Sequence, residues 1–158
     1  MAKVKTNAIR ILDAKKIAYE VLTYDNQDGK IDGVSVAGKI GRDPKEVYKT
    51  LVAQGASKSI YVYVIPVESE LDLKKAAKAA GEKNVEMIPV KDILKWTGYI
   101  RGGCSPIGMK KEYKTFIDVS CLDLESMVVS AGKIGVQIVI DPKMLEDLTK
   151  AETLDVRK

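Results

Sequence analysis

The 158-residue sequence has 26 basic and 22 acidic side chains, and 46% of its residues are hydrophobic. These values are ordinary for one folded domain with a substantial core, and a net charge of +4 does not by itself indicate a polyanionic partner. The sequence contains no histidine, which excludes Ser-His-Asp and Cys-His nucleophile systems and zinc sites with histidine ligands.

Neither a membrane span nor an export signal is expected. No stretch approaches the roughly 18 consecutive apolar residues of a spanning helix, and residues 1–7 lack the apolar core of a signal peptide. Cys104 and Cys121 are too few for a disulfide scaffold, so we expect reduced thiols. The basic excess is weaker than in most DNA-binding domains. We therefore expect a cytoplasmic protein without metal or cofactor that binds neither DNA nor membranes.

In chain order, the hydrophobic pattern first predicts a helix over residues 6–12, a strand over 19–24, a polar loop over 25–33 and a short helix over 35–40. A strand over 47–53 follows, and then the clearest strand of the sequence, over 59–65, which Pro66 ends. The next expected helix covers 71–80, with Asp72 near its start and Gly81 just past its end.

The second half is expected to contain shorter elements. They are a strand over 85–88, a helix over 89–96, a glycine-rich loop over 99–111, strands over 115–119, 126–130 and 136–140 with a turn over 131–135, and a helix from Asp141-Pro142 to about residue 148. The last strands are too closely spaced for helical crossovers, so that part is expected to be antiparallel. Together the elements predict a single domain, 1–158, of mixed α/β (α+β) class. Its sheet is a mostly antiparallel, curled sheet or partial barrel flanked by helices.

The segment from Gly33 to Lys39 resembles a phosphate-binding P-loop only superficially. That motif requires a serine or threonine after the lysine and a strand before the loop, whereas here Ile40 follows the lysine and a loop precedes the segment. We therefore interpret it as a surface helix.

Lys49 is a more promising candidate for chemistry. It shares a face of its expected strand with the apolar Val47 and Leu51, although lysines are rarely core residues and a buried ammonium is costly unless it is paired. One interpretation is an edge position whose charge reaches water. The other is a lysine that lines a pocket for an anion such as a terminal phosphate.

Two glycine-rich segments could bring backbone amides close to a ligand. In the segment 98–108, Gly102 and Gly103 permit close approach and Pro106 stiffens the chain, so its amides could hold a carbonyl oxygen or a phosphate. The alternative is a long connection without a ligand. The segment 130–135 is, taken alone, only a turn.

Taken together and in this order, several segments resemble one protein family. They are Thr6-Asn7-Ala8, Val47-Tyr48-Lys49-Thr50-Leu51, Leu71-Asp72-Leu73-Lys74-Lys75, Val85-Glu86-Met87, Thr97-Gly98-Tyr99, Gly102-Gly103-Cys104-Ser105-Pro106-Ile107-Gly108 and Ser130-Ala131-Gly132. They look like the YbaK (also called EbsC) proteins, which are Cys-tRNA(Pro) deacylases related to the editing domain of bacterial prolyl-tRNA synthetases. The resemblance extends from about Thr6 to Leu148.

The resemblance implies a barrel-like α/β fold and a mischarged tRNA as substrate, edited in trans together with prolyl-tRNA synthetase. A second hydrolytic sieve is physically reasonable, because binding alone discriminates poorly between small groups of similar size. The family mechanism also needs no histidine. The substrate's own thiol, with a free pKa near 8.5, ionises and attacks its own ester carbonyl to give a thiolactone, which then hydrolyses.

By resemblance, Lys49 is the essential lysine that anchors the phosphate of the terminal adenosine. The loop from Gly102 and Gly103 through Cys104, Ser105 and Pro106 contacts the carbonyl through backbone amides. The other substrate-binding residues implied are Tyr24, Thr50, Ser130 and Gln137. Cys104 is a poor candidate nucleophile because the sequence supplies it with no base.

Two departures from the family pattern leave the aminoacyl preference open. Gln137 stands where some members have an aspartate, and Asp32 where some carry an aromatic residue. Both departures leave the reaction class intact, so the first alternative is a deacylase for another small aminoacyl-tRNA, such as Ala-tRNA(Pro). A second alternative, of another class, is a non-catalytic module that binds the synthetase or tRNA.

Overall fold

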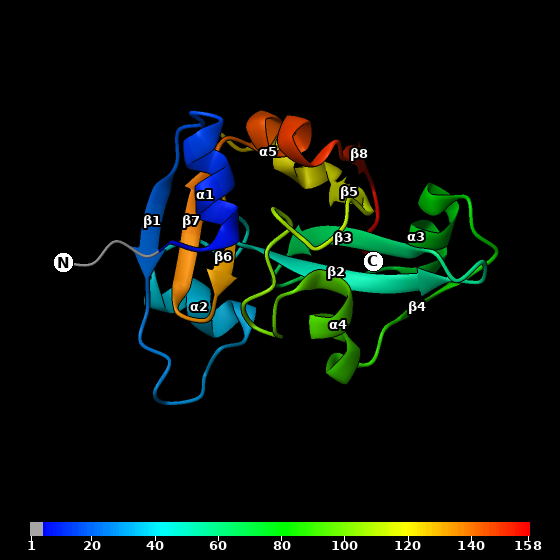
Figure 1. The fold of residues 1–158 in the computed structure, drawn as a ribbon, viewed down its shortest axis with the longest axis horizontal. Helices are drawn as coiled ribbons and strands as arrows, with labels where there is room; N and C mark the ends of the chain where they lie inside the picture. Colours follow the sequence, from blue (N-terminus) through cyan, green and yellow to red (C-terminus); the bar gives the residue numbers. More distant parts are fainter. Residues whose placement is uncertain (1–4) are drawn as a thin grey trace.

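The computed structural model describes residues 5–158, which form two sheets with helices packed around them (Figure 1). Residues 1–4, part of the segment examined for an export signal, lie outside the described residues. The helices are α1 (Asn7–Ala14), α2 (Gly33–Lys39), α3 (Leu73–Ala80), α4 (Ile93–Thr97) and α5 (Pro142–Thr149), with 3-10 turns η1 (Val90–Asp92) and η2 (Val119–Asp123). The strands are β1 (Glu20–Thr23), β2 (Tyr48–Gly55), β3 (Ile60–Pro66), β4 (Val85–Met87), β5 (Lys114–Asp118), β6 (Met127–Lys133), β7 (Val136–Ile140) and β8 (Glu152–Leu154). None of the described helices is long and apolar enough to cross a membrane.

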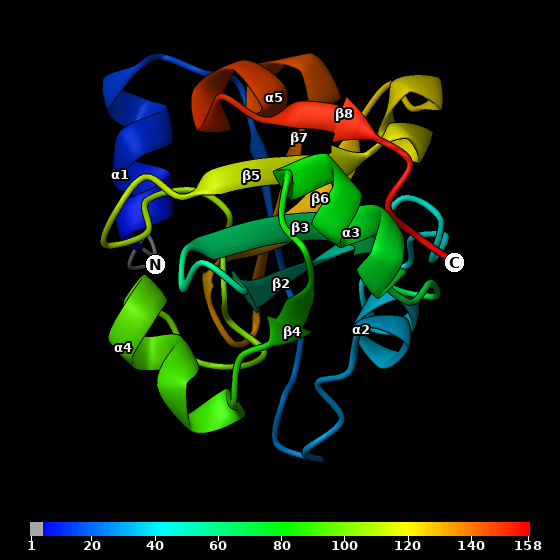
Figure 2. The same cartoon turned by 90° about the vertical axis from the view of Figure 1, so that its right-hand side faces the viewer.

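The smaller sheet has the strand order β1-β7-β6 and is antiparallel throughout. The larger has the order β4-β2-β3-β5-β8, which Figure 2 shows from β4 at the bottom to β8 at the top. A parallel bridge between Val47 and Val128 joins the two sheets at the start of β2. The mixed class and the flanking helices are thus confirmed, but the strands form two sheets rather than one curled sheet, and no barrel closes.

The expected antiparallel arrangement of the last strands holds for β6 and β7 and is wrong for β5. β5 pairs parallel with β3 on one side and parallel with β8 on the other. Spacing along the chain misleads here because β5 and β6 belong to different sheets. The connection from β3 to β5 contains α3, β4 and α4, which is long enough for a parallel crossover.

The main core lies between the two sheets and under α1. Apolar side chains of β2 and β3 meet those of β6 and β7 there, with Ile9 and Leu12 of α1 covering them. All seven residues of β3 are buried because α3 covers the other face of the larger sheet, where the Tyr63 hydroxyl donates to the carbonyl of Ala76. The strongest apolar run in the sequence is therefore the centre of the fold.

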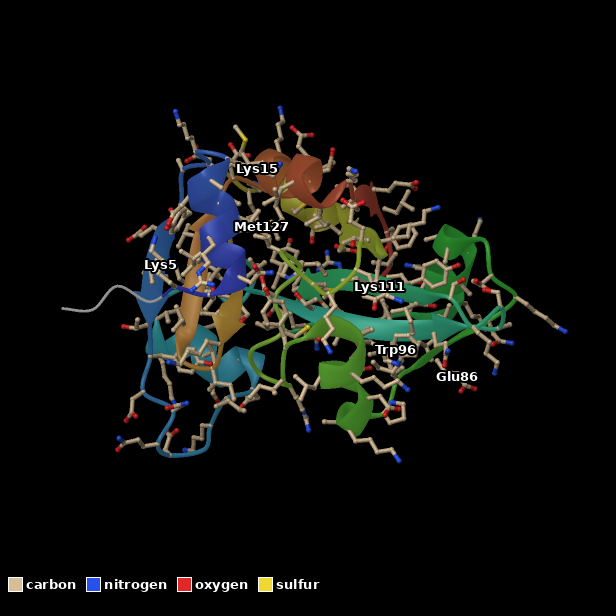
Figure 3. The ribbon with its side chains drawn as sticks, in the orientation of Figure 1. Lys5, Lys15, Glu86, Trp96, Lys111 and Met127 are labelled. Carbon is tan, nitrogen blue, oxygen red and sulfur yellow. The ribbon has the colours of Figure 1, made fainter. Side chains whose placement is uncertain are left out.

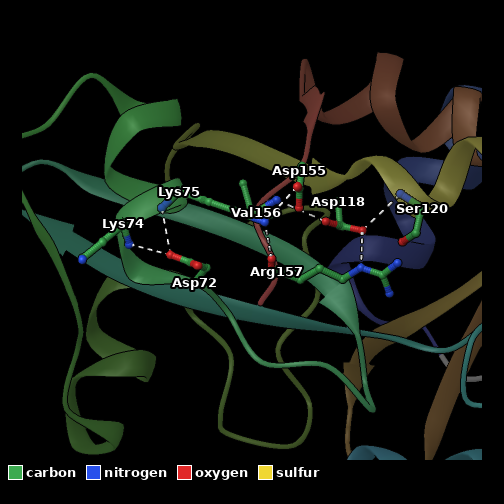
Figure 4. A network of polar contacts seen from close by, with 8 residues as sticks. All are labelled: Asp72, Lys74, Lys75, Asp118, Ser120, Asp155, Val156 and Arg157. Carbon is green, nitrogen blue, oxygen red and sulfur yellow. Dashed lines mark hydrogen bonds and ion pairs between the residues drawn. The ribbon is translucent and has the colours of Figure 1, made fainter.

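The C-terminal segment is fixed by a polar network that the sequence pattern does not reveal (Figure 4). The carboxylate of Asp118, whose side chain is 1% exposed, accepts hydrogen bonds from the amides of Ser120 and Val156 and pairs with Arg157 at 3.4 Å. Lys75 of α3 donates to the carbonyl of Arg157. These contacts hold β8 beside β5, which completes the edge of the larger sheet.

Candidate functional site

Lys49 lies at the start of β2, opposite Ile65 of β3. Its side chain is half-buried and makes no hydrogen bond or ion pair with any residue in the described range 5–158. Burial lowers the pKa of the Lys49 ammonium, and the attraction of Glu70 opposes this shift. A partly desolvated cation without a partner is well suited to bind an anion.

Two adjoining cavities meet at this lysine. The inner one has a volume of about 100 Å³ and the outer one about 650 Å³. The two cavities share six lining residues, which are Ile31, Gly33, Lys49, Thr50, Val67 and Gly102. The inner cavity also has Cys104, Ser130 and Gln137 in its wall, and the outer one extends to Gly29, Asp32 and Arg101. A small pocket thus opens into a larger groove, with Lys49 and Gly102 at the junction.

The glycine-rich loop over 98–108 reaches the pocket because its ends are joined and its middle packs tightly. The Lys110 amide donates to the carbonyl of Thr97 at 3.0 Å, which closes the loop at its base. A β-carbon on Gly103 would lie 2.9 Å from the Ile134 nitrogen, so only glycine permits this contact with the turn between β6 and β7. Gly102 adopts a φ of +85°, in the left-handed region that favours glycine.

Several amides of this loop have no acceptor within residues 5–158, and two of them belong to residues that line the inner pocket. Gly103 donates to the carbonyl of Ile100, but within residues 5–158 neither Gly102 nor Cys104 donates a backbone hydrogen bond. Both residues line the inner pocket. Amide donors held in a rigid loop are the usual means of stabilising a developing oxyanion.

Two hydroxyls of the expected site residues are buried without partners in the described part of the chain. The Thr50 Oγ1 and the Tyr24 hydroxyl have no hydrogen bond within the described part of the chain. Thr50 lines both cavities, whereas Tyr24 follows β1, and its ring lies 5.8 Å from the Lys39 ammonium. A buried hydroxyl left unpaired costs about 1–3 kcal/mol, so the Thr50 hydroxyl, which lies in the pocket wall, points to a ligand that hydrogen-bonds to it.

Thr50→Val should therefore separate stability from activity. Removal of an unpaired buried hydroxyl is expected to leave the free energy of unfolding unchanged or to raise it by about 1 kcal/mol. It should also lower kcat/KM about tenfold, because one hydrogen bond to the substrate is lost. Urea unfolding measures the stability, and hydrolysis of the mischarged tRNA that the family resemblance implies measures the activity of the same preparation. A variant that loses stability and keeps full activity would show that the hydroxyl serves the fold alone.

Ser130 and Gln137 face the inner pocket from neighbouring strands. They are register partners in β6 and β7 and are 8% and 6% exposed. The Ser130 hydroxyl accepts a hydrogen bond from the Gly132 amide, while the Gln137 side chain has no hydrogen bond in the described residues. Within those residues, no three His, Cys, Asp or Glu side chains gather as a metal-binding group. The pocket wall thus offers amide and hydroxyl groups.

Of the other expected loop residues, Cys104 lines the inner pocket, whereas Ser105 and Pro106 do not. Burial raises the pKa of the Cys104 thiol to about 11, so it is protonated near neutral pH and is not a competent nucleophile. Ser105 is fully buried, and its hydroxyl accepts from the Ile107 amide within the loop. Pro106 lines a different groove, beside α5.

Some wall residues could not be recognised from the sequence. Ile31, Gly33 and Val67 line both cavities, and a β-carbon on Gly33 would overlap the side chain of Val67. The P-loop-like lysine, Lys39, instead donates to the carbonyls of Asp25 and Lys30 and to Asp28, and so fixes the loop that borders the outer groove. Asp32, in the groove wall, caps α2 by accepting from the Ser35 amide. Gly33, which follows the capping residue Asp32, is the one sequence feature that could have indicated a close approach of α2 to Val67.

Residues 33–148 match the family described as the aminoacyl-tRNA editing domain. The chain belongs to this family. Apart from Ile31, every residue that lines the inner pocket lies within the matched range. The assignment confirms the resemblance seen in the sequence motifs and the class of activity, enzymatic editing of aminoacyl-tRNA.

Individual relatives of this editing domain carry related descriptions. The chain is 41% identical over 152 residues to an Enterococcus faecalis protein provisionally named the Cys-tRNA(Pro)/Cys-tRNA(Cys) deacylase EbsC, covering 96% of this chain and 93% of that protein. It is 26% identical over 154 residues to the proline–tRNA ligase of Burkholderia multivorans, covering 95% of this chain and 26% of the ligase. A solved structure provisionally described as a trans-editing enzyme for prolyl-tRNA synthetase has a TM-score of 0.83 at 21% identity, covering 99% of each chain, and so shares the fold.

Proposed function

We propose that this editing domain deacylates tRNA wrongly esterified with cysteine, Cys-tRNA(Pro) above all, with the substrate's own thiolate as nucleophile. One observation carries the proposal: the unpaired Lys49 ammonium and the free Gly102 amide stand where a small pocket opens into a larger groove. The pocket suits an aminoacyl group, and the groove suits the terminal nucleotide. The provisional name of the Enterococcus faecalis relative supports the choice of cysteine.

The protein's part in the reaction is orientation and charge stabilisation. After the substrate thiol loses its proton to solvent, the thiolate attacks the ester carbonyl, so a carbon–sulfur bond forms and the bond to the ribose oxygen breaks. The ribose oxygen takes a proton from water and tRNA leaves, and water then opens the thiolactone to free cysteine. The Gly102 and Cys104 amides donate to the carbonyl oxygen as negative charge develops there. Holding thiolate and carbonyl in reactive geometry supplies the remaining acceleration.

Lys49 acts as the anchor for the substrate's phosphate. Its position in both cavities allows the ammonium to bind the phosphate of the terminal adenosine while the ester reaches the inner pocket. Thr50, Tyr24, Ser130 and Gln137 then provide hydrogen bonds to the aminoacyl group.

The proposal extends to partner and compartment. Prolyl-tRNA synthetase is the proposed partner, because the chain is similar to a segment of proline–tRNA ligases and would act on the tRNA that they charge. Two buried thiols without a disulfide are consistent with the cytoplasm, where thiols stay reduced.

A comparison of three substrates tests the proposal. We expect rapid deacylation of Cys-tRNA(Pro), measurable deacylation of Cys-tRNA(Cys), since the catalytic thiol is the same, and slow deacylation of Ala-tRNA(Pro). If the alanyl ester is cleaved fastest, the enzyme is an editing deacylase for another residue and uses a bound water. If the wild-type protein cleaves none of the three, it is a binding module and the proposal fails.

A further inference from the structure

The positive charge of the chain is concentrated in one segment. Residues 89–111 contain five lysines and arginines and a single acidic residue, Asp92, so this segment accounts for the entire net charge of +4. The remaining 135 residues carry equal numbers of basic and acidic side chains. A modest total charge therefore conceals a local basic excess, which is the feature that matters for binding a polyanion.

Four of these side chains form a basic strip (Lys91, Lys95, Lys110 and Arg101). Lys91 and Lys95 are four residues apart along η1 and α4, and the Lys110 ammonium lies 3.3 Å from the Lys95 carbonyl. Arg101, four residues after the last residue of α4, lines the outer groove together with Lys49. The strip thus begins at the candidate site and continues onto α4, which stands at the lower left in Figure 2.

The folded chain keeps the strip together and exposed. The Lys110 amide bonds the Thr97 carbonyl, and the Tyr113 hydroxyl bonds that of Trp96, which ties the far end of the loop to α4. Figure 3 labels Trp96 on α4 and Lys111 just past the loop. All four side chains of the strip are exposed, and none forms an ion pair with a residue of the described range, although nine ion pairs occur there. The Lys95 ammonium lies 4.9 Å from the centre of the Trp96 ring and the Lys110 ammonium donates to a carbonyl, but no carboxylate of the described range neutralises these cations, so their charge can attract an external anion.

We infer that the basic strip binds the phosphates of the tRNA acceptor strand leading away from the esterified end. This inference rests on the proposed function, which places the terminal nucleotide in the outer groove. A strand leaving that groove past Arg101 meets the cations of α4 next. Continuity with the groove and the lack of acidic partners favour RNA over a protein surface, because each added phosphate contact strengthens binding by counterion release.

The triple variant Lys91→Ala/Lys95→Ala/Lys110→Ala tests this inference with two substrates. For Cys-tRNA(Pro) at low salt, we expect KM to rise at least tenfold. The slope of log kcat/KM against log salt concentration should become less steep by roughly 2–3, since each of the three lysines removed contributes roughly 0.7–0.9. For the cysteinyl ester of adenosine 5′-monophosphate, which keeps the phosphate proposed to bind Lys49 but lacks the acceptor strand, kcat/KM should not change. The matched control, Lys74→Ala/Lys78→Ala/Lys143→Ala, removes the same charge from exposed positions on α3 and α5 and should leave both substrates unaffected.

Each contrary result has a separate meaning. If the triple variant cleaves both substrates as fast as the wild-type protein does, and its KM for Cys-tRNA(Pro) is unchanged, the strip does not bind RNA and the inference is overturned. An effect seen only when prolyl-tRNA synthetase is present overturns it in favour of a protein contact. Equal losses on both substrates overturn it in favour of a role in the groove itself. Failure of the wild-type protein on both substrates is different, because it removes the proposed function.

Discussion

Lys49→Met should reduce kcat/KM for Cys-tRNA(Pro) by roughly 100-fold, since a hydrogen bond to a charged group contributes about 1.5–3 kcal/mol. Methionine keeps the length of the apolar stem and removes only the ammonium. Single-turnover deacylation with enzyme in excess measures the effect, and Lys74→Met on the exposed surface of α3 is the matched control. Full activity of the Lys49 variant would remove this lysine from the site.

The same substitution should not weaken the fold. Burial lowers the pKa of Lys49 below its unfolded value, so the folded state disfavours the charged form at every pH below the unfolded pKa. Removing the ammonium therefore relieves a cost at neutral pH, and the free energy of unfolding should stay level or rise. A large fall in urea stability would instead show that Lys49 has a structural partner.

Gly103→Ala should also cost activity, here by moving the loop. The new β-carbon would lie 2.9 Å from the Ile134 nitrogen and 3.1 Å from the Lys133 carbonyl carbon, both backbone atoms that cannot rotate away. Displacement of the loop by a fraction of an ångström is expected to lower kcat/KM by up to about 100-fold. The overpacking should also reduce stability by about 1–3 kcal/mol, so the assay must be run well below the melting temperature.

Gly38→Ala provides the control for that glycine. It lies within α2, has no atom within 4 Å of the added β-carbon and lines neither cavity. Alanine is the better helix former by about 1 kcal/mol, so this variant should be slightly more stable and fully active. Equal activity of the Gly103 and Gly38 variants would mean that the position of the loop does not matter for catalysis.

The local elements could be predicted well because their signals are local. The apolar run of β3, the cap at Asp72 and the cap at Asp141 all appear in the structure near the expected residues. The division into two sheets depends on which strands pair over long distances, as β5 does with β3. β8 went unpredicted because a three-residue strand has little pattern of its own and is held by Asp118 and α3.

Candidate site residues could be predicted from the sequence where the residue type is unusual for its position or permits an unusual backbone contact. Lys49 is a charged residue in an otherwise apolar strand, and Gly102-Gly103 permit close approach of the backbone to a ligand, so the sequence predicts both as site residues. Ile31 and Val67 could not be predicted as wall residues, because in the sequence an apolar residue of a pocket wall cannot be distinguished from a core residue. The unpaired hydroxyls of Thr50 and Tyr24 become visible only after every potential partner has been placed in space.

The central claim is that the protein shapes the substrate so that the substrate's sulfur breaks its own ester. Single-turnover deacylation of Cys-tRNA(Pro) and Ser-tRNA(Pro), with mass analysis of the first released product, tests it directly. We predict cleavage of the cysteinyl ester at least about 100-fold faster, with the thiolactone as first product, since only the thiol forms an appreciable nucleophilic anion near neutral pH. Equal rates for the two esters, with free amino acid as the first product of both, would contradict the account.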